Sequence, residues 1–131
     1  ASDVYKRQFQ IPIAFLNMEE KGETLTYETM IAPPPENLIT SADIADFGEV
    51  VRKRFSSWWN EAEGKDFASD VPTYFGSTTR HEMLERTVWH STQHVRQVHS
   101  LLEQAGVIPD QPLTTEDIQG LPLTEKVWDE T

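Results

Sequence analysis

The residues best suited to chemistry are the four histidines, which all fall in one stretch of the chain, at positions 81, 90, 94 and 99. An α-helix turns about 100° per residue, so His90 and His94 would lie about 40° apart on one face. The other two would lie about 180° from His90, and we expect them to face solvent. Two neutral imidazoles at i and i+4 can share one divalent ion, although a stable site needs a third ligand. His90 and His94 are therefore candidate metal ligands, and the alternative is a pair of partly buried structural histidines.

Gln97 is the nearest candidate for a supporting role beside this pair. It would lie about 20° from His90 on the same helix. Such an amide can hold a ligating imidazole in place through a hydrogen bond. A solvent-exposed glutamine is the alternative interpretation.

Other catalytic arrangements fit the chain less well. The chain contains no cysteine, so any thiol in its chemistry must come from outside. His81 and Glu82 begin a metalloprotease-like pattern, but Glu85 stands where the second metal-binding histidine should be. Ser91 follows His90 directly, so on a helix it points about 100° away and cannot pair with that imidazole. We expect it to be a small inward-facing residue.

The histidines lie in a segment whose pattern predicts one helix over residues 79–105. Thr79 and Glu82 have the spacing of a capping box, and Gly106 follows the last apolar residues. The apolar positions form an inward stripe, with the candidate ligands along its edge. Its members are Met83, Leu84, Thr87, Val88, Val95, Val98, Leu101 and Leu102.

Two further helices are expected earlier in the chain. Apolar residues from Phe9 onward predict a buried helix with Pro12 in its first turn and Gly22 just past its end. The stretch from Ser41, as the cap, to Gly64 predicts a helix of about six turns. Its adjacent tryptophans, at positions 58 and 59, cannot both face inward.

The remaining segments are expected to be connections. Residues 23–40 contain three consecutive prolines and no periodicity, which predicts a long loop. Residues 65–77 suit a connection that packs against the helices rather than pairing as strands. The tail after Val107 is interrupted by prolines, and within it we expect one short helix that begins near Thr115 and stops at Gly120. The apolar residues beyond it should fold back onto the helices.

Composition limits the partners and the class of protein. The 131 residues fit one domain, and 22 acidic against 11 basic residues give a net charge of -11. Such a charge argues against a nucleic-acid partner. No apolar run approaches the roughly 18 residues of a membrane span, and no signal-peptide pattern is present. We expect a cytoplasmic protein with neither nucleic acid nor membrane as partner.

The region from Glu85 to Glu103, centred on Trp89-His90-Ser91-Thr92-Gln93-His94-Val95-Arg96-Gln97, resembles the DinB-like family (DinB superfamily) of metal-binding helical bundles. The tail, Gly120-Leu121-Pro122-Leu123-Thr124-Glu125-Lys126-Val127-Trp128, is similar to one subgroup. The resemblance implies an all-α, up-down four-helix bundle. It also implies a divalent metal, zinc or nickel, held by one ligand on an earlier helix and by His90 and His94.

The start of the chain bears on the third ligand. Residues 3–8 resemble a translated sequencing adapter, so residues 1–8 are expected to be such a scar or a disordered start, and 9–131 a single DinB-like helical domain. By the resemblance, the third ligand would fall near Arg7, and arginine cannot ligate a metal. The resemblance thus implies a lost first helix and a lost third ligand, with about three long helices and a short C-terminal helix remaining.

Two functions follow as expectations. One is a metal-dependent transferase that binds a low-molecular-weight thiol as thiolate at open metal positions. The alternative is a non-catalytic metal-binding or structural helical module that self-associates, as a homodimer, through an apolar flank. The sequence names neither a substrate nor a catalytic residue beyond the metal ligands.

Overall fold

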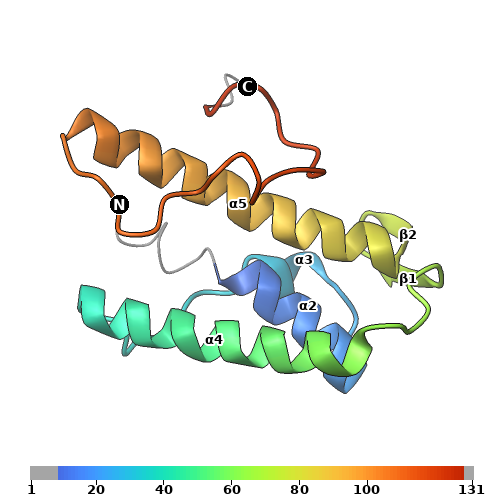
Figure 1. Ribbon diagram of the computed structural model, residues 1–131. Coiled ribbons are helices and arrows are strands. Elements are labelled where there is room, and N and C mark those ends of the chain that lie inside the picture. Colours follow the sequence, from blue (N-terminus) through green and yellow to red (C-terminus); the bar gives the residue numbers. More distant parts are fainter. Residues whose placement is uncertain (1–8, 129–131) are drawn as a thin grey trace. The chain divides into compact units, whose positions relative to one another are not determined.

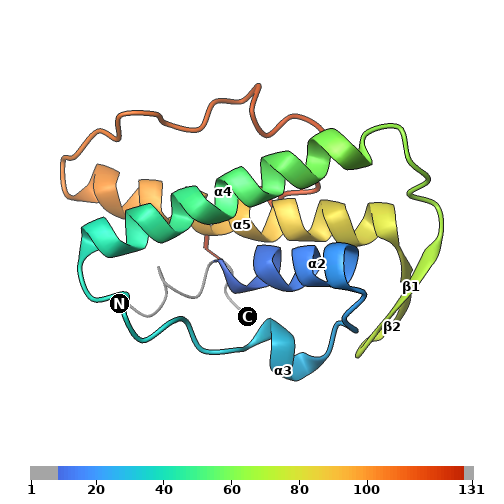
Figure 2. The same ribbon diagram turned by 90° about the horizontal axis from the view of Figure 1, so that it is seen from below.

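The computed structural model describes residues 9–128, about half of them helical (Figures 1 and 2). In this part of the chain there are four helices, α2 (Gln10–Lys21), α3 (Tyr27–Met30), α4 (Ser41–Ala62) and α5 (Arg80–Gln104), and two strands, β1 (Asp70–Thr73) and β2 (Gly76–Thr79). The chain divides into two compact units, with the boundary between Thr87 and Val88 inside α5. The expectations for residues 1–8, including Arg7, lie outside the described residues.

The two early helices lie where the sequence predicts them. Pro12 is the third residue of α2, so its missing N–H falls among the first-turn donors that have no partner within a helix. Gly22 ends α2 with φ 70°, a conformation that glycine adopts without strain. The cap of α4 is Thr40 rather than Ser41: its hydroxyl accepts a hydrogen bond from the Asp43 N–H at 3.1 Å, and the Asp43 carboxylate accepts one from the Thr40 N–H at 3.0 Å.

Helix α5 also matches its predicted bounds closely. At its start the Thr79 hydroxyl accepts a hydrogen bond from the Glu82 N–H at 3.1 Å. At its end the Val107 N–H donates to the Leu102 carbonyl at 2.8 Å and Gly106 takes φ 75°. These bonds satisfy backbone groups that would otherwise lack partners at the two ends.

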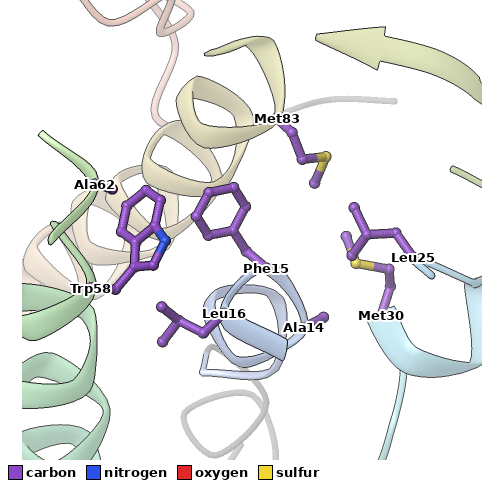
Figure 3. Close-up of a cluster of buried hydrophobic side chains, with 8 residues drawn as sticks. All are labelled: Ala14, Phe15, Leu16, Leu25, Met30, Trp58, Ala62 and Met83. Carbon is purple, nitrogen blue, oxygen red and sulfur yellow. The ribbon is translucent and has the colours of Figure 1, made fainter. Parts of the chain in front are cut away.

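The core of the first unit is built around an aromatic cluster from α2 and α4 (Figure 3). The Phe15 ring is fully buried and packs edge-on against Trp58, with 5.0 Å between ring centroids. Trp59 is exposed, so one of the two adjacent tryptophans faces inward, as predicted. The buried members of the core are Ala14, Phe15, Leu16, Leu25, Met30, Trp58, Ala62 and Met83.

An ion pair joins the second half of α2 to the first residue of α5. The Arg80 Nε donates to both carboxylate oxygens of Glu19 at 3.1 Å, and its Nη1 donates to the Asp66 carbonyl at 2.7 Å. The guanidinium also lies 4.9 Å from the centre of the Phe67 ring. The hydrogen bond with Glu19 raises the pKa of the Arg80 guanidinium, so this arginine stays charged.

The prediction for residues 65–77 is wrong in one respect, because they contribute to an antiparallel hairpin. Asp70 pairs with Thr79 and Thr73 with Gly76, which leaves a two-residue turn of Tyr74 and Phe75. This turn lacks the Asn-Gly or Asp-Gly pair that usually marks a hairpin, and the proline within β1 argues against a strand. Proline is tolerated on edge strands, and each strand of a two-stranded sheet is an edge strand. The fold is therefore mainly helical rather than strictly all-α.

Two other connections differ from expectation. The predicted loop 23–40 contains the one-turn helix α3, capped by Thr26 and Thr29 through reciprocal hydrogen bonds. The predicted short helix near Thr115 is absent from the described tail, where residues 115–120 form turns instead. Thr114 and Asp117 make reciprocal hydrogen bonds of the capping-box kind, but no helix follows them.

The predicted inward stripe of α5 is correct only in part. Met83 and Thr87 are buried, and the Thr87 hydroxyl donates to the Met83 carbonyl at 2.8 Å. Val88 and Leu101 are exposed. Val88 follows Thr87 directly and so points about 100° away from that buried face, and Leu101 lies in the last turn of the helix.

No helix in the described residues is long and apolar enough to cross a membrane.

Candidate functional site

The structure brings the two candidate ligands together in the second half of α5. The imidazole rings of His90 and His94 are half-buried, with centroids 4.5 Å apart and planes inclined by 79°. Zinc binds an imidazole nitrogen at about 2.1 Å, so two rings on one ion at 90–109° would have centroids roughly 4.6–5.3 Å apart. The observed spacing is close to this range. Two rings this close could share an ion, but the spacing is also that of an ordinary edge-to-face ring contact, so metal binding stays a prediction.

The orientation of the His94 ring is tied to Gln97. The His94 Nδ1 lies 3.1 Å from the Gln97 Oε1. An amide oxygen can only accept, so this contact is a hydrogen bond when Nδ1 carries the proton of the neutral ring. The Nε2 of His94 then keeps its lone pair, which is the atom a metal needs. Gln97 thus supports His94, three residues away, rather than His90 as the wheel suggested.

The same glutamine also contacts the segment that follows α5. This segment turns back after the helix (Figure 1), as the sequence predicted. The Val127 carbonyl accepts hydrogen bonds from the Gln93 Nε2 at 2.6 Å and from the Gln97 Nε2 at 3.4 Å. Two amides on one face of α5 therefore hold one main-chain oxygen of the tail.

Arg96 extends this contact along the tail. Its Nη1 donates to the Thr124 carbonyl at 2.9 Å and to the Gln93 Oε1 at 2.8 Å, and its Nη2 lies 3.4 Å from the Glu125 carbonyl. The sequence predicted that apolar residues hold the tail against the helices, and it did not identify these polar side chains of α5. A signal existed in the spacing, since donors at positions 93, 96 and 97 share one helix face.

The two remaining histidines of α5 differ in their exposure. His81 is exposed, as predicted, and its Nε2 lies 3.8 Å from a Glu85 carboxylate oxygen. His99 is half-buried rather than exposed. The helical wheel describes an isolated helix and does not include burial by other parts of the chain.

Two polar side-chain atoms next to His90 in the sequence are buried. The Ser91 Oγ and the Trp89 Nε1 have no hydrogen-bond partner among the residues described. The burial of the Ser91 Oγ agrees with the expected inward-facing position.

The candidate site consists of two imidazoles with one supporting amide. Within residues 9–128, no group of three histidine, aspartate or glutamate side chains lies close enough to hold a metal. Two imidazoles leave other coordination positions for water or an added ligand. No family model, curated protein or solved structure matches this chain.

Proposed function

We propose that this chain binds a divalent metal ion through His90 and His94 and is a variant of the DinB-like helical bundle that its sequence resembles. The observation that carries the proposal is the spacing of the two rings, 4.5 Å between centroids. The contact between His94 and Gln97 supports it, because it leaves the Nε2 of His94 able to ligate. The described part of the chain is mainly helical, in keeping with a bundle.

The donor set favours zinc or nickel over magnesium or calcium. Imidazole nitrogen suits the borderline transition metals, whereas magnesium and calcium prefer oxygen ligands. A bound ion with open positions would stabilise an external low-molecular-weight thiol as thiolate, which is the chemistry of a thiol-dependent transferase. The chain itself would hold the ion through two neutral imidazoles and keep the second of them oriented through Gln97.

Calorimetric titration with zinc and with nickel tests the binding proposal. His90→Ala and His94→Ala should each weaken binding by at least about tenfold, or about 1.4 kcal/mol, because each removes half of the protein ligands. His81→Ala is the matched control, since it removes an exposed imidazole from the same helix. An equal loss of metal affinity in all three variants would contradict the proposed site. So would unchanged affinity in His90→Ala and His94→Ala.

A second candidate is a non-catalytic helical module that self-associates. Large apolar side chains remain exposed in each unit, with Ile39 at 79% and Ile108 at 86% of their accessible surface. Such exposure is typical of surfaces that bind other chains when it is contiguous. Sedimentation equilibrium together with a thiol-transfer assay on the zinc-loaded protein separates the candidates. Transfer that requires both histidines supports the enzyme, and a dimer with no transfer supports the module.

A further inference from the structure

A continuous series of hydrogen bonds links the His94 imidazole to the main chain of the tail. The ring nitrogen Nδ1 contacts the Gln97 Oε1 at 3.1 Å, and the Gln97 Nε2 lies 3.4 Å from the Val127 carbonyl. The same carbonyl accepts a shorter bond, 2.6 Å, from the Gln93 Nε2. The two ends of the Gln97 amide therefore have different partners, one on the helix and one on the tail.

These partners determine which way the amide of Gln97 points. A backbone carbonyl can only accept, so the Val127 oxygen requires the NH2 end of the amide. The oxygen end then faces His94, where it can only accept, and the proton must sit on Nδ1. The tautomer of His94 thus follows from a tail residue through one intervening side chain.

We propose that Gln97 is a positioning residue for His94, and that the Val127 carbonyl orients it. The role of this positioning rests on the proposed metal-binding function, in which Nε2 is the ligand atom of His94. Hydrogen bonding of the second ring nitrogen orients metal-bound histidines and makes them better ligands. In this chain an amide on the next turn of α5 provides that hydrogen bond.

The position of the proton on His94 can be measured without any metal. Heteronuclear NMR of nitrogen-labelled protein distinguishes the two neutral tautomers at a pH well above about 6.5, where histidine is ordinarily uncharged. Gln97→Met keeps the length of the side chain but removes the acceptor. It should shift the tautomer ratio of His94 away from Nδ1–H by roughly fivefold, the equilibrium equivalent of one net hydrogen bond.

Two further variants separate positioning from general structural damage. Gln97→Glu presents an acceptor to the Nδ1 proton whichever way its carboxylate turns, although it cannot donate to the Val127 carbonyl, and it should return the ratio at least to the wild-type value. Gln104→Met makes the same substitution in the last turn of α5, where the amide lies 3.4 Å from the Ser100 hydroxyl, and should leave the ratio unchanged. Far-UV circular dichroism should show the same helix content in every variant. An unchanged ratio in Gln97→Met, or a shift in Gln104→Met of equal size, would overturn the proposal.

Zinc titration of the same proteins distinguishes failure of this inference from failure of the proposed function. Gln97→Met should weaken zinc binding by roughly tenfold, the usual effect of losing such a supporting group, and Gln97→Glu should recover most of it. A shifted tautomer ratio with no zinc binding by the wild type would overturn the metal function while supporting the pairing of Gln97 with His94. An unchanged ratio with normal zinc binding would overturn the role of Gln97 and leave the metal function intact.

Discussion

Replacing Arg80 by methionine should destabilise the first unit strongly. The side chain of Glu19 is only 7% exposed and receives hydrogen bonds from the Nε and Nη2 atoms of Arg80. Methionine preserves much of the aliphatic stem but offers no donor. The variant would therefore leave a buried carboxylate without its partner and deprive the Asp66 carbonyl of a donor.

The size of the effect follows from the burial of the pair. Removing one member of a fully buried ion pair costs about 3–5 kcal/mol. Arg80 is itself 22% exposed, so water reaches part of the site and we expect the lower end, about 3 kcal/mol. The double variant Arg80→Met with Glu19→Met removes both charges, and it should recover most of the loss because no unpaired ion remains.

Urea unfolding, monitored by circular dichroism, measures these differences in the free energy of unfolding. Arg52→Met is the matched control: Arg52 pairs with Glu49 on the exposed surface of α4, and its loss should leave the unfolding midpoint unchanged. A loss below about 1 kcal/mol for Arg80→Met would refute the reasoning. So would a double variant that is less stable than the single one, because the cost would then not come from an unpaired carboxylate.

Three further variants test the core and the cap of α4. Phe15→Ala should cost about 4 kcal/mol in urea unfolding, because the fully buried ring packs against Trp58 and its removal leaves a cavity. Thr40→Ala should cost about 1 kcal/mol by the same measurement, through loss of the hydroxyl that caps the helix. Hydrogen bonds donated by the backbone N–H groups of Thr40 and Ile39 lower the pKa of Asp43 below 3.8. The contribution of this carboxylate to stability is therefore present above pH 3.8 and lost as the pH falls through the lower folded-state pKa, so the difference between wild type and Asp43→Ala should shrink in acid.

Local interactions explain what could be predicted from sequence. The bounds of α2 follow from Pro12 and Gly22, and those of α4 and α5 follow from apolar periodicity and nearby capping residues. All of these act within one or two helical turns. The adjacency of His90 and His94 follows from the same geometry, because any α-helix places residues at i and i+4 side by side. These features need no knowledge of the rest of the chain.

Contacts between distant parts of the chain required the tertiary structure. Glu19 and Arg80 are separated by 61 residues, and Gln93 and Val127 by 34, so no local pattern marks them as partners. Whether such groups meet depends on how the intervening chain folds, since each contact must offset the entropy of closing a long loop. Sequence alone placed two imidazoles on one helical face. Which ring nitrogen of His94 carries the proton depends also on the position of the tail. The Val127 carbonyl orients the Gln97 amide, and the oxygen of that amide accepts the hydrogen bond from His94.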